Sequence, residues 1–270
     1  MGLRVNTNLF SINAQRNLSN VTERLGTNFA RLSSGLRITT AADDAAGLGI
    51  SERMRAEIRS LGAAGRNAQD GVSLAQTAEG ALAEVSNNLV RMRELAVQAA
   101  NGTLNTEDRA ALDEEFQELI TEIDRIATET DFNGTSLLDN TNSVSIQVGT
   151  DSGDTIDITF SDMQAAALGL TGDVTSEANA ASVLADLDAA IQSVASARSD
   201  FGAKQNRLQS ATRSISNARE NLSAAESRIR DVDVASETAD LTRNSILQQA
   251  AVSVLAQANV QPQLALSLLG

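Results

Sequence analysis

The chain of 270 residues lacks several residue types on which most enzymes depend, since it contains no Cys, His, Trp or Tyr. Without Cys or His it cannot form a disulfide, a thiolate or imidazole zinc site, or a Ser-His-Asp or Cys-His nucleophile system. Aromatic residues make up only 2% of the chain, which is too few to anchor a large compact core. We therefore expect a long helical assembly with no catalytic residues, no bound metal and no cofactor.

Positive charge is scarce as well. The 21 Lys and Arg residues face 35 Asp and Glu residues, which gives a formal net charge of -14 and a pI of about 4.4. The stretch between Ile126 and Ala197 contains no basic residue, so we expect an acidic, solvated surface there. Because phosphate binding needs a concentrated basic surface, nucleic acid is not an expected partner.

Neither end of the chain has the pattern of a membrane or leader segment. The run from Asn244 to Gly270 is uncharged, but it contains many amides and Pro262, whereas a bilayer span needs about 20 predominantly apolar residues. We expect this run to be a helix buried against protein, with no membrane insertion. The first residues lack a secretory signal pattern, so the protein is either cytoplasmic or exported without a cleaved leader.

Apolar residues recur at helical spacing in both end regions of the chain. The interpretation includes a local break of the last helix near Pro262. Because these regions carry little charge, we expect their apolar residues to contact other copies of the chain. The candidate assembly residues are Leu18, Val21, Leu25 and Phe29 near the start, and Leu247, Val254, Leu255, Leu266 and Leu269 near the end.

The middle of the chain contains longer helical patterns and one change of period. Helices are predicted over residues 43–100, 106–130 and 180–232, and Asn133-Gly134 is expected to close the second of these. Over residues 143–160 apolar and polar residues alternate around Asp151-Ser152-Gly153-Asp154, which predicts a β-hairpin. The expected fold class is mainly α: a long antiparallel helical bundle or coiled coil with a small β-hairpin in the middle of the chain.

Six short motifs resemble those of bacterial flagellin. The likeness extends from about Val5 to Asn140 and from about Leu184 to Leu269, in the same order. Only about forty residues separate the two arms, so the chain resembles a short flagellin that lacks the outer variable domains. The motifs are Asn6-Thr7-Asn8, Leu32-Ser33-Ser34-Gly35-Leu36-Arg37-Ile38, Asp43-Asp44-Ala45-Ala46-Gly47, Arg93-Glu94-Leu95-Ala96-Val97-Gln98, Phe132-Asn133-Gly134 and Ser253-Val254-Leu255-Ala256-Gln257-Ala258-Asn259.

The resemblance implies a structural subunit, not an enzyme, that self-assembles into the extracellular filament used for swimming. It implies passage through the flagellar type III apparatus without a cleaved signal peptide. Residues 1–42 and 234–270 would form a terminal coiled-coil domain lining the filament core, with helices from Asn6 to Leu32 and from Leu241 to Leu269. Residues 43–233 would form the rod domain, with the hairpin at about 143–160. The implied partners are further copies of the chain, an export chaperone, and cap and hook-associated proteins.

Two surface sites follow from the same resemblance. Arg91 and Leu95 are four residues apart on one helix, and Glu115 lies on the next, antiparallel helix. The resemblance implies that this patch binds Toll-like receptor 5 and also packs against a neighbouring subunit. By likeness to flagellins that carry O-linked sugars, the hairpin hydroxyls of Ser143, Ser145 and Ser152 are candidate glycosylation sites.

Two alternatives to a filament subunit stay open on the sequence. A hook-filament junction protein would have the same fold. An amphipathic lipid-surface protein would place Lys or Arg beside its apolar face, which the uncharged tail does not do. A calcium site at Asp151, Asp154 and Asp157 is disfavoured, because their spacing differs from that of an EF-hand loop.

Overall fold

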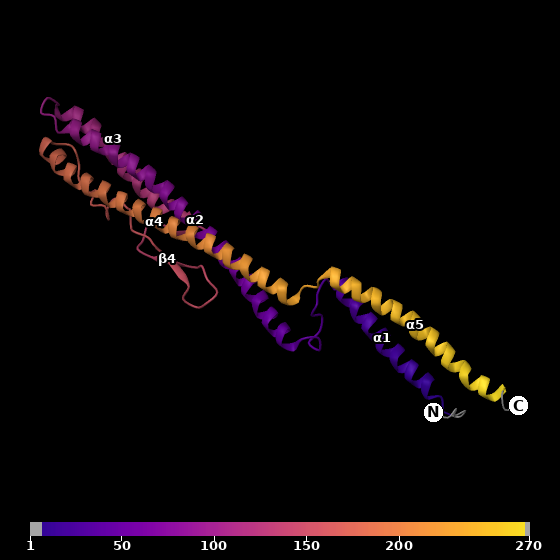
Figure 1. The fold of residues 1–270 in the computed structure, drawn as a ribbon. Helices are drawn as coiled ribbons and strands as arrows, with labels where there is room; N and C mark the ends of the chain where they lie inside the picture. Colours follow the sequence, from indigo (N-terminus) through magenta and orange to yellow (C-terminus); the bar gives the residue numbers. More distant parts are fainter. Residues whose placement is uncertain (1–6, 268–270) are drawn as a thin grey trace. The chain divides into compact units, whose positions relative to one another are not determined.

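The computed structural model describes residues 7–267, and their side chains as far as residue 261. Figure 1 shows long helices with small strand pairs in the middle of the chain, which confirms the predicted fold class. The helices are α1 (Leu9–Ser34), α2 (Ala45–Ala99), α3 (Thr106–Glu129), α4 (Glu177–Arg230) and α5 (Val234–Ser267). The antiparallel strand pairs are β1 (Asp131–Phe132) with β2 (Thr135–Ser136), and β3 (Ser143–Gln147) with β4 (Thr155–Thr159).

The chain forms two compact units. The first comprises Met1–Ala56 and Asn221–Gly270, and the second comprises Glu57–Glu220. Helices α1 and α5 belong to the first unit, α3 and the four strands belong to the second, and α2 and α4 contribute to both. The predicted division into a terminal domain and a rod domain concerns roles in an assembly, so it stays a prediction.

In the first unit, α1 and α5 lie side by side and antiparallel (Figure 1). The Oδ1 atom of Asn8 caps α1 by accepting from the backbone N–H of Ser11 at 3.1 Å. The helix ends at Ser34 and is capped by Gly35, whose φ of 72° is a left-handed conformation that glycine adopts without steric cost. The observed end at Ser34 lies two residues beyond the predicted end at Leu32.

Two expectations for α5 were wrong. The helix begins at Val234, seven residues before the predicted start at Leu241, because the Asp233 carboxylate accepts from the N–H of Ala235 at 3.0 Å and caps it. The expected break near Pro262 does not occur, since α5 continues to Ser267. A proline removes the hydrogen bond to the carbonyl four residues earlier. That carbonyl, on Ala258, accepts instead from Asn8 Nδ2 at 2.7 Å.

The core of the second unit lies between α2, α3 and α4. Each helix contributes a stripe of apolar side chains at three- and four-residue steps, as the sequence predicts. The largest fully buried members are Leu82, Leu89, Met92 and Leu95 on α2, Phe116 and Ile123 on α3, and Leu187 and Leu208 on α4.

The two ends of helix α3 differ in part from the ends that the sequence predicts. Asn105 and Asp108 form a capping box, so the cap is the residue before the predicted Thr106 start. The helix ends at Glu129, before Asn133-Gly134. That pair, with φ values of 53° and 76°, forms the turn between β1 and β2. The expectation that Asn133-Gly134 closes the helix was therefore wrong, because the pair turns a hairpin of its own.

The predicted hairpin at 143–160 is confirmed, with Ser143 opposite Thr159 and Gln147 opposite Thr155. Ile156, Ile158 and Phe160 are buried. The segment that follows the hairpin is tied to α3 by two carboxylates that the sequence did not single out. Asp124 Oδ1 accepts from the N–H of Ala165 at 2.7 Å, and Asp113 Oδ1 accepts from the N–H of Val174 at 2.9 Å.

Candidate assembly interface

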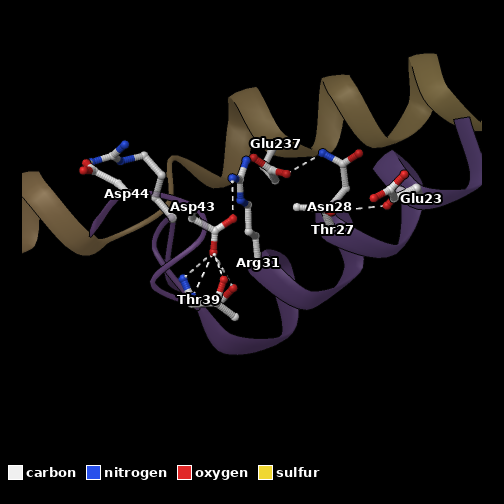
Figure 2. Close-up of polar contacts among 10 residues, drawn as sticks. Glu23, Thr27, Asn28, Arg31, Thr39, Asp43, Asp44 and Glu237 are labelled. Atoms are coloured by element: carbon white, nitrogen blue, oxygen red, sulfur yellow. Dashed lines mark hydrogen bonds and ion pairs between the residues drawn. The ribbon is translucent and has the colours of Figure 1, made fainter. Parts of the chain in front are cut away.

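A polar cluster lies within the seam between α1 and α5. Asn28 Nδ2 donates to the carboxylate of Glu237, and Asn28 Oδ1 accepts from Asn244 Nδ2 at 2.8 Å. Figure 2 shows Asn28 of α1 and Glu237 of α5 pointing toward one another. Both residues are buried, with 7% and 8% exposure, although neither was singled out from the sequence. A buried polar pair between helices favours one register, because any slip leaves its atoms without partners.

Exposed apolar side chains gather on the same two helices. A pair of helices covers only the facing stripe of each, so apolar residues on the other sides stay in contact with water. Phe10 and Val254 are each 59% exposed. An exposed apolar surface of this extent is typical of a protein contact site. Its members are Leu9, Phe10, Ile12 and Phe29 on α1, and Val234, Ile246, Leu247, Val252, Val254 and Val260 on α5.

The structure separates the predicted assembly residues into three groups. Leu18, Val21, Leu25 and Leu255 are partly buried. Phe29, Leu247 and Val254 are exposed, as an interface with another copy requires. The side chains of Leu266 and Leu269 lie outside the described residues. Leu9, Phe10 and Ile12 were missed, although their lack of charged neighbours was a signal available in the sequence.

The loop between α1 and α2 is fixed by one carboxylate. Asp43 accepts from the N–H groups of Thr39 and Thr40 at 3.1 and 2.9 Å, from both threonine hydroxyls, and from Arg31 at 3.2 Å (Figure 2). The donors of Thr39 and Thr40, the backbone N–H of Thr40 foremost, hold the pKa of the Asp43 carboxyl well below its ordinary value of 3.8. Asp43 is therefore a structural anchor rather than an acid poised for catalysis.

The same loop is joined to the connection between α4 and α5. The N–H of Arg37 donates to the Arg230 carbonyl at 2.7 Å, and the N–H of Val232 donates to the Gly35 carbonyl at 3.0 Å. Leu36 and Asp231 pair as an antiparallel bridge between these bonds. Backbone hydrogen bonds thus join two segments that are nearly two hundred residues apart in the chain, beside the α1–α5 pair.

In the second unit, the structure brings together two of the three predicted receptor residues. Arg91 Nε donates to Glu115 Oε1 at 2.8 Å, and Arg91 Nη1 donates to Glu94 at 3.0 Å. These bonds, with Glu115 foremost, raise the pKa of the Arg91 guanidinium. Leu95 is only 1% exposed and lies in the core. Leu95 therefore contributes to the core, and its side chain is not exposed for a partner to contact.

Two valines extend the surface around Arg91. Val90 and Val97 are 48% and 51% exposed and, with Glu94 between them, follow the spacing of one helix face. Neither valine was singled out from the sequence. Their spacing relative to the buried Leu89, Met92 and Ala96 was the signal that could have found them.

The hairpin hydroxyls differ in availability. Ser143 and Ser152 are exposed. The Ser145 hydroxyl donates to the carboxylate of Asp157 on the opposite strand, so it is already engaged. Asp154 Oδ2 accepts from the N–H of Asp151 at 3.3 Å within the turn. In residues 7–267 there is no group of three or more acidic side chains arranged to hold a metal ion.

Within the same described part of the chain, no helix is both long enough and apolar enough to cross a membrane. The grooves beside α2 are shallow and lined mainly by small or polar side chains. One of them, near Gln76, Glu79, Gly80, Ala83 and Arg198, has a volume of about 260 Å³.

Comparison with known proteins gives matches along both arms. The profile of the bacterial flagellin N-terminal helical region matches residues 5–143, and that of the bacterial flagellin C-terminal helical region matches residues 184–269. Together these profiles span well over half of the chain.

Full-length relatives give the same result. A flagellin of Halalkalibacterium halodurans is 51% identical over 98% of this chain and 99% of its own length. The flagellar filament 30.7 kDa core protein of Treponema maltophilum is 43% identical over 98% of this chain and 99% of its own. The crystal structure of Bacillus cereus flagellin, at 40% identity, covers 60% of this chain and 94% of that chain with a TM-score of 0.52.

Proposed function

Because the chain belongs to the bacterial flagellin family, we propose that α1 and α5 carry the contacts through which it polymerises. It is a structural subunit of the flagellar filament, an extracellular assembly that drives swimming. The observation that carries the proposal is the exposed apolar surface of these two helices, which an isolated chain leaves in water. The family is structural, and we expect no catalytic activity.

In this proposal, residues 1–42 and 234–270 form the coiled-coil domain that lines the filament core. The exposed Phe29, Leu247 and Val254 would contact neighbouring subunits, while Leu18, Val21, Leu25 and Leu255 would hold α1 and α5 together. Residues 43–233 would form the surrounding rod. The absence of charge after Arg243 supports the assignment, because burying uncharged apolar surface between subunits carries no cost for desolvating ions.

Further partners follow from the same role. We propose an export chaperone for the subunit, passage through the flagellar type III apparatus without a cleaved leader, and cap and hook-associated proteins at the filament ends. A chain with no Cys and one Pro suits passage in an unfolded state, since neither disulfides nor several slow proline isomerisations delay refolding. Ser143 and Ser152 are the better candidates for O-glycosylation, because the Ser145 hydroxyl is engaged by Asp157.

A hook-filament junction protein is the alternative that the fold would permit. Relatives that match the whole chain include a flagellin and a filament core protein, and these favour the filament subunit.

Deleting residues 259–270 is expected to abolish polymerisation. The deletion removes Val260, the Asn259 contact with Ser11 and the end of α5, whereas the second unit keeps all its residues. The intact chain, mixed with short filament seeds, should grow long filaments in electron micrographs, and the truncated chain should grow none while its circular dichroism stays helical. Long filaments from the truncated chain would contradict the role of α5, and failure of the intact chain to grow would contradict the proposed function.

We propose that the surface around Arg91 and Glu115 serves two partners, Toll-like receptor 5 and a neighbouring subunit. Arg91→Ala is expected to weaken receptor signalling by the soluble subunit and to slow polymerisation, because it removes both ion pairs and uncovers two unpaired carboxylates. A cell-based reporter assay and a seeded growth assay measure the two effects.

Arg93→Ala is the matched control for this prediction. Arg93 lies on the same helix and makes one exposed ion pair, with Asp188 at 2.7 Å. Its loss should leave signalling near the wild-type level. An Arg91→Ala subunit that signals as strongly as the wild type would refute the receptor assignment, whatever its filaments look like.

A further inference from the structure

Asn8 uses the two ends of its amide on two different helices. Its Oδ1 accepts from the N–H of Ser11 and caps α1, while its Nδ2 donates to the carbonyl of Ala258 on α5 at 2.7 Å. A second bond lies beside it, because Ser11 Oγ, three residues after Asn8, donates at 2.8 Å to Oδ1 of Asn259, the residue after Ala258. Ser11 and Ala258 are buried, with 9% and 6% exposure, whereas Asn8 is half-buried and Asn259 is exposed, so the Ala258 carbonyl lies at the shielded end of its bond with Asn8.

The acceptor on Ala258 is free for a reason visible in the sequence. In an α-helix its carbonyl would accept from the N–H of residue 262, but residue 262 is proline and has no N–H. A buried backbone carbonyl without a donor costs about 1–3 kcal/mol. The Asn8 amide therefore replaces a hydrogen bond that α5 cannot make for itself.

We propose that Asn8 is a positioning residue that sets the register of α1 against α5. Its amide donates the hydrogen bond that the Ala258 carbonyl cannot receive from Pro262. In an α-helix the carbonyls of the other residues in the middle of α5 accept from its own N–H groups. The Ala258 carbonyl is therefore a backbone acceptor that α5 leaves for a side chain from α1. Sliding α1 by one turn, about 5.4 Å, would take the amide out of reach and leave the carbonyl unpaired. The proline thus defines the position at which α1 docks.

The hydrogen bond between Asn8 and Ala258 can be separated from the cap on α1 by choice of substitution. Asn8→Asp keeps an oxygen that accepts from Ser11 and is a good capping residue, but it has no group that donates to Ala258. Asn8→Ser is a neutral second variant, which caps α1 with a hydroxyl too short to span the seam. Pro262→Ala restores the N–H to α5 and makes the donor from Asn8 redundant.

Amide hydrogen exchange of the soluble full-length chain, followed by mass spectrometry of peptides from residues 248–261, tests the proposal independently of polymerisation. In the wild-type background Asn8→Asp and Asn8→Ser should each speed exchange roughly five-fold, the equivalent of one net hydrogen bond of about 1 kcal/mol. In the Pro262→Ala background the same substitutions should change exchange by less than about two-fold.

Equal effects in the two backgrounds would overturn the proposal, because Asn8 would then act only as a cap on α1. An unchanged exchange rate in the wild-type background would overturn it as well. Failure of the chain to polymerise would refute the proposed function. It would leave the test of the Asn8–Ala258 bond unaffected, since the exchange measurement reports on a single chain.

Discussion

Seeded filament growth is expected to fall below detection when Leu247 and Val254 are both replaced by glutamate. The two side chains are 43% and 59% exposed on α5, in the uncharged part of the helix. If they become buried between subunits, each new carboxylate loses its hydration at a cost of several kcal/mol without a cation to pair with it. The critical concentration for polymerisation should rise more than about a hundred-fold, as measured by sedimentation and electron microscopy.

Two control variants separate this effect from general damage. Val254→Ala removes apolar area without adding charge and should raise the critical concentration only modestly. Ser236→Glu adds a carboxylate at an exposed position in the first turn of α5, where the helix dipole favours it, and should leave growth nearly unchanged. Normal filaments from the double glutamate variant would show that the exposed face of α5 is not an interface.

Phe116→Ala is expected to destabilise the second unit by about 3–5 kcal/mol. Phe116 is 1% exposed and is among the largest side chains in the core between α2, α3 and α4. Its removal leaves a cavity among long helices that are tied to partners along their length and cannot readily close around it. Thermal or urea unfolding followed by circular dichroism gives the change in the free energy of unfolding.

Phe29→Ala is the chemically matched control, because Phe29 is 55% exposed on α1. In the soluble chain it should change the free energy of unfolding by less than about 0.5 kcal/mol, as surface substitutions usually do. The same variant should matter far more in the filament. A Phe116→Ala chain as stable as the Phe29→Ala chain would show that the core is packed loosely around α3.

Local sequence patterns predicted most of the helices and the central hairpin. Apolar spacing located α1, α2, α3 and α4, and the alternation around Ile146 and Ile158 located β3 and β4, because both signals depend on residues close together in the chain. The continuation of α5 through Pro262 could not be predicted from local patterns. The Ala258 carbonyl, which has no N–H donor at residue 262, accepts from Asn8, 250 residues away.

The candidate site was predicted less completely for related reasons. The resemblance placed Leu95 in a surface patch, and its four-residue spacing from Arg91 does not reveal that its side chain is buried in the structure. Phe10 was missed because a helix packed against one partner leaves apolar residues exposed that a bundle would cover. The polar pair of Asn28 and Glu237 has no local signature, since each residue alone is ordinary on a helix surface.

The pairing of the first helix with the last has a consequence for the order in which the chain folds. Contacts such as that between Asn8 and Ala258 span nearly the whole sequence, so closing them costs more loop entropy than closing the hairpin, whose strands are neighbours. A chain delivered from its N-terminal end would present α1 long before α5 exists to cover it. The second unit, built from residues 57–220, can be complete before the seam closes. The helices that expose the most apolar surface are then the last to pair, and they stay available to neighbours until the final residues arrive.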